Sequence, residues 1–190
     1  MANRNTAGFG LVPAGTLGGS PSIQGQGKYK IDAGHSTTIY NGECVKISSG
    51  YVVGGNGSAA DVLGVLNGIF FNAADTLKPT FSNFYKATIT PANSEDTTAF
   101  VIDDPFQQYV VAADTATGVT TFLKTYDMNS SAGSDTTGKS SSTLDISETG
   151  ANDKQFRMLR SAEDPENEDA TAVRHSVIVV SNLNSFNGHN

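Results

Sequence analysis

The chain has 190 residues, enough for one sizeable domain or for one domain with an arm. Only 16% of the residues are charged and the formal net charge is −7, so we expect neither a nucleic-acid partner nor a membrane partner. No apolar stretch approaches the ~20 residues of a membrane-spanning helix. The single cysteine, Cys44, excludes an internal disulfide and a cysteine-based zinc cluster.

Residues 1–27 show neither a helical nor a strand period. Glycines alternate there with single apolar residues, among them Phe9, Leu11 and Leu17. This pattern is typical of an extended N-terminal arm that lies on another surface and can be removed without unfolding the rest; a disordered tail is the alternative. The opening residues form no apolar segment, so we expect no signal peptide and synthesis in the cytoplasm.

Residues 28–190 contain short β-forming runs separated by Gly, Asn, Asp and Ser. Asn41-Gly42 predicts a hairpin, and Ser49-Gly50 predicts a second turn. The pattern predicts a mainly β fold, a single barrel or sandwich that is jelly-roll-like and has long loops. The expected strands lie near residues 29–31, 37–40, 45–47, 51–53, 62–71, 86–89, 99–102, 107–112, 120–126 and 176–180.

Helix is scarce in the pattern. Asn152 can begin a short helix over residues 153–161, and a strand around residues 156–159 fits equally well. Residues 130–142 are rich in Ser, Gly and Thr, which predicts a surface loop. Residues 163–169 carry five carboxylates but lack the ligand spacing of an EF-hand, so we expect a solvated loop without a bound metal.

Residues 133–140, Gly-Ser-Asp-Thr-Thr-Gly-Lys-Ser, match the phosphate-loop pattern GxxxxGK[ST] letter for letter. In such a loop Lys139 would reach the terminal phosphate and Ser140 would hold Mg²⁺. That chemistry needs an apolar strand before the loop and a helix after it. Polar residues precede the match here, and a run of hydroxyl residues follows it. We interpret the match as coincidental and expect no nucleotide and no other cofactor.

No catalytic residue is predicted. The histidines His35, His175 and His189 are isolated, and none has the spacing of a metal site. Cys44 lies in an apolar run, which indicates a small buried residue rather than a nucleophile paired with His35. The sequence therefore indicates a protein that is not an enzyme.

Several short segments distributed along the chain form a set. Val101-Ile-Asp-Asp-Pro105 is the most characteristic of them. The others are Gly8-Phe-Gly-Leu-Val-Pro13, Leu17-Gly-Gly-Ser-Pro21, Tyr40-Asn-Gly-Glu-Cys-Val-Lys-Ile47, Leu63-Gly-Val-Leu-Asn-Gly68, Thr137-Gly-Lys-Ser140, Asp164-Pro-Glu-Asn-Glu168 and Val177-Ile-Val-Val180. Taken together, these segments resemble the head decoration proteins of tailed bacteriophages, also called cement proteins. The resemblance touches most of the chain, while each motif alone is short.

The resemblance implies a structural virion protein, made in the host cytoplasm, that binds the outer surface of a capsid. It would stabilise contacts between major capsid protein subunits as a symmetric homo-oligomer, a trimer before a dimer. The predicted capsid or subunit contacts are Arg4, Phe9, Leu11 and Leu17. The alternative is a carbohydrate- or receptor-binding β module of a head or tail fibre. Such modules usually expose aromatic side chains, and the sequence contains no Trp.

Overall fold

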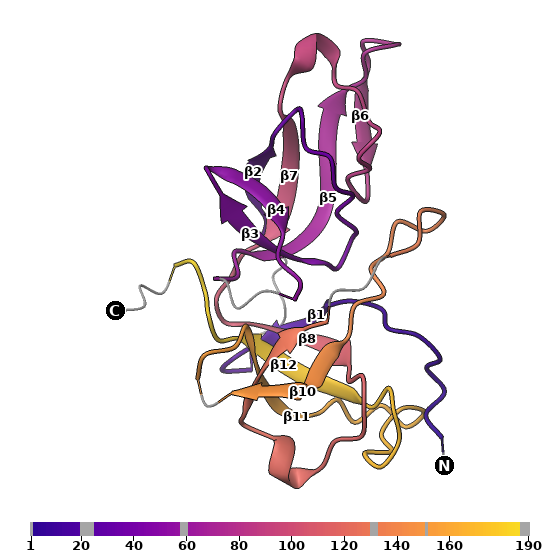
Figure 1. Cartoon of the computed structure of the whole chain (residues 1–190), viewed down its shortest axis with the longest axis vertical. Coiled ribbons are helices and arrows are strands. Elements are labelled where there is room, and N and C mark those ends of the chain that lie inside the picture. The colour runs from indigo at the N-terminus through magenta and orange to yellow at the C-terminus, as the bar shows by residue number, and fades with distance from the viewer. Residues whose placement is uncertain (1, 20–24, 58–60, 130–132, 151, 187–190) are drawn as a thin grey trace.

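The computed structural model describes residues 2–19, 25–57, 61–129, 133–150 and 152–186. Within these ranges the secondary structure consists of strands β1 to β12 and two 3-10 turns, Ala92–Ser94 and Val119–Thr121. The strands form two antiparallel sheets that pack together (Figure 1). The prediction of a mainly β protein with little helix is confirmed.

The first sheet has six strands in the spatial order β1-β8-β12-β11-β9-β10. Only β1 comes from the N-terminal part of the chain, and it pairs with β8 through a bulge between Pro13 and Gly15. The strands are β1 (Val12–Thr16), β8 (Gln107–Ala112), β9 (Thr125–Met128), β10 (Leu144–Gly150), β11 (Phe156–Ser161) and β12 (Ser176–Ser181).

The second sheet follows the order β2-β7-β5-β3-β4. Strand β3 pairs with the beginning of β5, and β6 pairs with the end of β5, residues 69–72. The sheet curls until its edge strands β2 and β4 lie near each other, and it encloses a core of its own around Ile31, Val52 and Leu66. The described strands do not close into a barrel. They are β2 (Gly27–Ile31), β3 (Cys44–Ser48), β4 (Tyr51–Gly54), β5 (Gly64–Asn72), β6 (Pro79–Ser82) and β7 (Thr97–Ile102).

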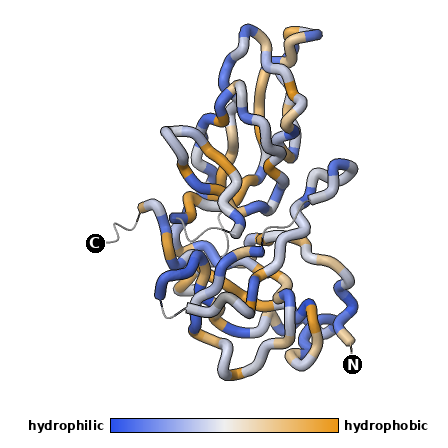
Figure 2. The backbone as a smooth tube through the Cα atoms, viewed as in Figure 1, coloured by the Kyte–Doolittle hydropathy of each residue, from blue (hydrophilic) through white to orange (hydrophobic). Residues whose placement is uncertain are grey.

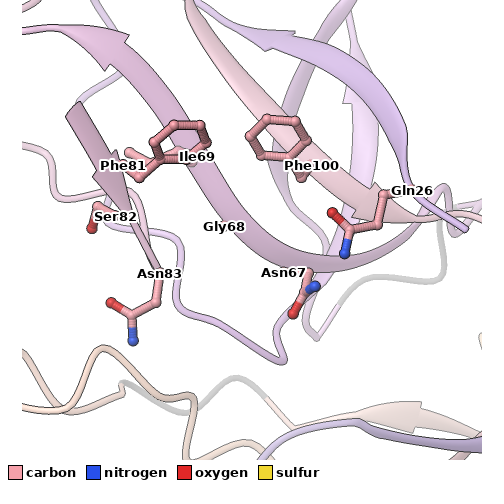
Figure 3. A pocket seen from close by; sticks show the side chains of 8 residues that line it. All are labelled: Gln26, Asn67, Gly68, Ile69, Phe81, Ser82, Asn83 and Phe100. Atoms are coloured by element: carbon pink, nitrogen blue, oxygen red, sulfur yellow. The ribbon is translucent and has the colours of Figure 1, made fainter. Parts of the chain in front are cut away.

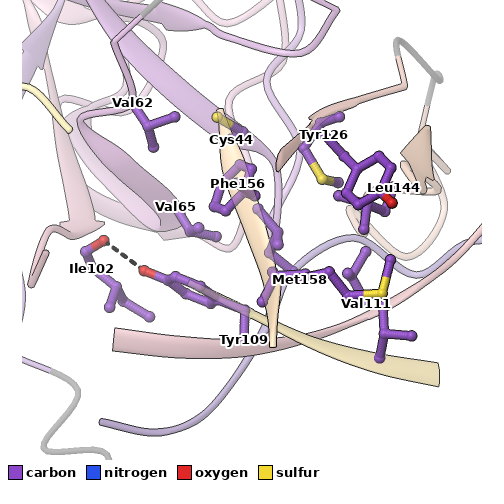
Figure 4. Close-up of a cluster of buried hydrophobic side chains, with 14 residues drawn as sticks. Cys44, Val62, Val65, Ile102, Tyr109, Val111, Tyr126, Leu144, Phe156 and Met158 are labelled. Carbon is purple, nitrogen blue, oxygen red and sulfur yellow. Dashed lines mark hydrogen bonds between the residues drawn. The ribbon is translucent and has the colours of Figure 1, made fainter. Parts of the chain in front are cut away.

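A second hydrophobic core joins the two sheets (Figure 4). Cys44 and Val65 of the second sheet pack in one cluster with Tyr109 and Phe156 of the first. The Tyr109 hydroxyl donates a hydrogen bond to the Ile102 carbonyl at 3.2 Å, across the connection between the sheets. In Figure 2 hydrophobic stretches run along the strands of both sheets, consistent with these two cores. The sheets are therefore held to each other by buried apolar side chains.

The connectivity is simple, because each sheet is built mostly from its own stretch of chain. Strands β2 to β7 belong to the second sheet and β8 to β12 to the first, so the chain crosses between sheets only after β1 and after β7. The sequence predicts either a barrel or a sandwich, and the structure shows the sandwich, two packed sheets. The strand order is not that of a jelly roll.

Most predicted strands are confirmed, including β8, whose bounds coincide with the predicted residues 107–112. The turn between β3 and β4 is also confirmed, since Ser49 (φ 51°) and Gly50 (φ 87°) both have positive φ, as a two-residue hairpin of the primed type requires. At residues 153–161 the strand alternative is correct: β11 forms there, and no helix does.

Two predicted strands and the Asn41-Gly42 hairpin are wrong, and the strand predicted at residues 120–126 is only partly correct. Residues 37–40 and 86–89 are irregular; Ile39 forms an isolated bridge with Tyr85, just before the second segment, and the Ala87 N–H donates to Thr38 Oγ1 at 3.3 Å. Asn41-Gly42 therefore makes a turn, with the Glu43 N–H donating to the Tyr40 carbonyl, but no hairpin. The 3-10 turn at Val119–Thr121 replaces the start of the predicted strand 120–126.

The N-terminal segment is not an arm separate from the β domain. Strand β1 belongs to the first sheet, and Leu11 is 1% exposed within the core that joins the sheets. Gly10 N–H donates to the Ser142 carbonyl and Leu11 N–H to the Gly42 carbonyl. The physical reason is that the glycines allow close backbone contact with the body: a Cβ on Gly8 would lie 2.1 Å from the Ser141 carbonyl oxygen.

Candidate binding surfaces

The segment 133–140 does not form a phosphate loop. It connects β9 to β10, so a strand follows it where a phosphate loop needs a helix. Ser140 is buried, its hydroxyl lies 2.7 Å from that of Ser142, and its N–H donates to the Asn41 carbonyl. Lys139 is exposed. The segment holds the turn at Asn41 in place. The sequence predicts a surface loop for residues 130–142, but Ser140, Ser142 and Thr143 are buried. Residues 130–132 lie outside the described ranges.

His175 lies between two hydroxyl groups. Its Nε2 is 3.0 Å from Ser161 Oγ and its Nδ1 is 2.5 Å from Thr117 Oγ1. A Ser-His pair acts as a nucleophile where a third group orients the imidazole and substrate can reach the serine. Here the third group is a hydroxyl, His175 is 1% exposed, and burial lowers its pKa. The contacts join the chain before β12 to the end of β11 and serve packing.

Cys44 is confirmed as a buried residue. It lies in the core between the sheets, burial raises the pKa of its thiol, and the Gln155 amide nitrogen lies 3.9 Å from its sulfur. His35 packs its ring against Tyr85, with centroids 5.5 Å apart. His189 lies outside the described residues. The buried environment of Cys44 disfavours the thiolate that a cysteine nucleophile requires.

The acidic stretch 163–169 is largely exposed, as predicted, apart from Asn167, which is 5% exposed. Asn167 Oδ1 accepts a hydrogen bond from the Asn5 N–H at 2.7 Å, and Arg4 forms an ion pair with Glu166. Within the described ranges no group of three or more His, Cys, Asp or Glu side chains is arranged to hold a metal ion. The loop holds the N-terminal segment in place.

The four predicted contact residues lie in different environments. Arg4 is on the surface in its pair with Glu166, Phe9 is half-buried beside the 133–141 loop, and Leu17 is 44% exposed. Leu11 is inside the protein and is not accessible to a partner. Of the three predicted apolar anchors, Leu17 is therefore the most exposed.

Leu17 is one of three exposed apolar residues at the edge of the first sheet. Its N–H donates to the carbonyl of Phe106, which is 59% exposed, and Val12 at the start of β1 is 46% exposed. Strand β1 is the last strand on this side of the sheet, and no described strand pairs with its outer edge. We name Val12, Leu17 and Phe106 the β1 edge surface. An open strand edge bordered by apolar side chains can pair with another chain.

A second surface, a groove of about 430 Å³, opens beside β5, β6 and β7 (Figure 3). Phe81 is 73% exposed, and its ring centroid lies 6.1 Å from that of Phe100 with the planes 16° apart. Phe70 tilts against Phe81 at 4.9 Å. Figure 3 shows the rings of Phe81 and Phe100 side by side. They form an aromatic platform along one side of what we name the aromatic groove.

Amide side chains lie along the rest of this groove. Asn67 Oδ1 accepts from the Asn41 amide at 3.4 Å, which leaves the Asn67 amide nitrogen as a donor. Asn83 Nδ2 donates to the Thr137 carbonyl at 2.8 Å, which leaves Asn83 Oδ1 as an acceptor. Gln26 contributes a third exposed amide. The groove thus offers both donors and acceptors next to an aromatic face.

A bulge in β5 creates the space. Leu66 pairs with Val101 and Gly68 pairs with Phe100, so Asn67 is the extra residue and is displaced from regular pairing. Gly68 has φ +149°, and a Cβ there would lie 3.1 Å from the Ser82 carbonyl oxygen. The missing side chain leaves the groove open opposite Phe100.

Sequence reasoning missed the aromatic groove, because its residues come from four separate segments of the chain. The available signal was Gly68 inside an otherwise apolar strand, which is typical of a bulge or a close approach. The alternative hypothesis of a carbohydrate-binding module depended on exposed aromatic side chains. The structure supplies them as phenylalanines, although the chain has no Trp.

Comparisons of the chain with protein-family models, with curated proteins and with solved structures found no match. No helix in the described ranges has the length and apolar character needed to span a membrane.

Proposed function

We propose that the protein is a decoration protein of a tailed-phage head, which binds the outer surface of the capsid and stabilises contacts between major capsid protein subunits. The β1 edge surface carries the proposal. It combines a strand edge that pairs with no other described strand with Val12, Leu17 and Phe106, which are exposed at 46%, 44% and 59%. A capsid subunit can meet such a surface with backbone hydrogen bonds and apolar contacts together.

The resemblance of the sequence to head decoration proteins supplies the identity of the partner. Val12 of the β1 edge surface lies in the segment Gly8–Pro13, and Leu17 begins the segment Leu17–Pro21; both segments carry part of that resemblance. The rigid attachment of residues 3–11 to the body also supports binding, because a preordered surface loses less conformational entropy on association. The proposal includes a virion location and a symmetric oligomer, a trimer before a dimer, so that one copy's β1 edge surface is repeated around a capsid axis.

The test is binding of purified protein to capsids of the phage that encodes it, prepared without this protein. The double variant Leu17→Ser, Phe106→Ser should lose at least tenfold in apparent affinity, measured by co-sedimentation. The matched control is Val119→Ser, Leu123→Ser, which removes two exposed apolar side chains at 86% and 64% exposure elsewhere on the same half of the molecule. The control variant should bind as well as the unchanged protein.

Two results would contradict the proposal. If the unchanged protein does not bind capsids, the decoration function is wrong. If both double variants bind equally well, the protein decorates capsids through a surface other than the β1 edge surface. Sedimentation equilibrium of the free protein tests the oligomer separately, with a monomer at all concentrations contradicting that part.

A further inference from the structure

We propose that the aromatic groove binds a neutral carbohydrate, with a sugar ring on the platform of Phe81 and Phe100 and its hydroxyl groups on the amides of Asn67, Asn83 and Gln26. This site is additional to the capsid contact and does not depend on it. The groove involves the second sheet, whereas the β1 edge surface lies on the first. Both sites can therefore be occupied in one molecule.

The platform matches the apolar face of a sugar ring. Phe81 and Phe100 have planes only 16° apart, and Phe81 is 73% exposed although neighbouring core positions are closed to water. The C–H groups on one face of a pyranose carry partial positive charge, and an aromatic face is negative, so the two attract when stacked. A single exposed Phe needs no explanation, but Phe70, Phe81 and Phe100 in ring contact form an organised surface.

The remaining lining matches hydroxyl groups. Each sugar hydroxyl both donates and accepts, and the groove presents the Asn67 nitrogen as a donor and the Asn83 oxygen as an acceptor. Both amides are already oriented, Asn67 by Asn41 and Asn83 by the Thr137 carbonyl. Less side-chain entropy is then lost when the ligand binds.

The absence of charged side chains in the lining of the groove favours a neutral ligand. All of the side chains that line the groove are uncharged. A nucleotide could also stack on the platform, but its phosphates would find no cation in the lining. Lys28 pairs with Phe100 in the register of β2 and β7, yet it is not part of the lining. The volume of about 430 Å³ falls in the range of small-ligand sites, which suits one or two sugar rings.

The experiment screens the full-length protein against an array of neutral and sialylated oligosaccharides, followed by titration of the best neutral oligosaccharide by calorimetry. Phe81→Ala should weaken binding at least tenfold, because it removes the exposed half of the platform. Asn67→Ala should weaken binding severalfold. Gly68→Ala should also weaken it, because the added methyl group would lie in the lining of the groove, 3.1 Å from the Ser82 carbonyl oxygen.

The matched control is Phe106→Ala, which makes the same chemical change on the β1 edge surface. It should leave carbohydrate affinity unchanged and lower capsid binding, whereas Phe81→Ala should do the reverse. Circular dichroism of each variant checks folding, and folding is expected because Phe81 is mostly exposed. This pair of variants separates failure of the carbohydrate site from failure of the capsid contact.

Several outcomes would overturn the carbohydrate site. They are an array on which no neutral oligosaccharide is bound, binding that persists in both Phe81→Ala and Asn67→Ala, and binding restricted to sialylated oligosaccharides and lost in Lys28→Ala. If Phe81→Ala lowers capsid binding and no oligosaccharide binds, the platform is a protein contact.

Discussion

Glu43 places a carboxyl group where water hardly reaches it, in the turn before β3. The residue is 9% exposed, and its Oε2 accepts one hydrogen bond, from the Tyr40 N–H at 2.9 Å. Burial raises its pKa from 4.5 to about 7, and the hydrogen bond offsets only part of this effect. Between these two pH values the folded protein binds a proton that the unfolded chain has released. The free energy of unfolding therefore falls as the pH rises through this window.

We expect Glu43 alone to lower the free energy of unfolding by about 3 kcal/mol between pH 4.5 and pH 8. Glu43→Gln keeps an oxygen for the Tyr40 N–H but cannot ionise, so the variant should be more stable than the unchanged protein at pH 8 and similar to it at pH 4.5. Urea unfolding at both pH values measures this. Equal pH dependence in the two proteins would show that the Glu43 carboxyl is not desolvated.

Gln155 connects the sheets through polar contacts inside the core. It is completely buried, its Oε1 accepts from the Met128 N–H at 3.0 Å, and its Nε2 donates to the Gly55 carbonyl at 2.6 Å. Gln155→Leu keeps the size of the side chain but leaves both backbone groups without these partners. We expect a loss of about 2–5 kcal/mol in the free energy of unfolding.

The control for Gln155→Leu is Gln108→Leu in β8, where the side chain is half-exposed. This change should alter stability by no more than about 0.5 kcal/mol. Urea unfolding of the two variants at one pH compares them directly. A similar effect at both positions would mean that the buried amide contributes no more than a surface one.

At the scale of elements, β1 and the segment before it depend on close backbone packing. Removal of residues 2–20 would delete β1 and take Leu11 out of the core, so the deletion expected from the sequence to be harmless should unfold or weaken the domain. Gly8→Ala is a more focused change, because its Cβ would overlap the Ser141 carbonyl oxygen. We expect it to cost about 1–3 kcal/mol and to make the N-terminal segment sensitive to protease.

Thr6→Ala is the control for Gly8→Ala, since Thr6 is exposed in the same segment. Limited proteolysis followed by mass spectrometry shows where each variant is first cut. Unchanged resistance in Gly8→Ala would mean that the segment can move away from Ser141 without loss of its other contacts.

Strands marked by an adjacent turn signal or by an apolar run could be predicted from the sequence, and strands without either signal could not. The β3-β4 hairpin is marked by Ser49-Gly50, and β8 and β12 by apolar runs. β1 has few apolar residues, and it is a strand because β8, more than 90 residues later, supplies its hydrogen bonds. The bridge from Ile39 to Tyr85 shows the opposite case, in which β-forming residues lack a neighbouring strand with matching register.

The same reasoning explains the candidate sites at the scale of the whole molecule. Leu17 could be predicted as an accessible contact, but its neighbour Phe106 could not, because the pairing of β1 with β8 brings them together. The aromatic groove likewise depends on the register of β5 with β6 and β7, which places Phe81 beside Phe100. Residue type and spacing along one chain do not contain that register.

The decoration hypothesis makes a prediction for the intact particle. A protein that binds the joints of an assembled shell stabilises the assembled state by mass action. Particles that lack this protein should therefore release DNA at a lower temperature than decorated particles, and more readily at low ionic strength. DNA accessibility to a fluorescent dye during heating measures the difference. Adding back the purified protein should restore the higher temperature. Particles of equal robustness with and without the protein would leave adhesion as the better function.

The pairing of β1 with β8 also has a consequence during translation. All described strands of the second sheet lie between Gly27 and Ile102, so they leave the ribosome before β8 does. At ~5–20 residues per second, β1 waits several seconds for its partner. We expect ribosome-bound chains that end near residue 130 to resist protease over residues 27–102 while residues 1–19 are cut. Pro13 and the neighbouring glycines are poor strand formers, so the waiting segment has little tendency to pair with other nascent chains.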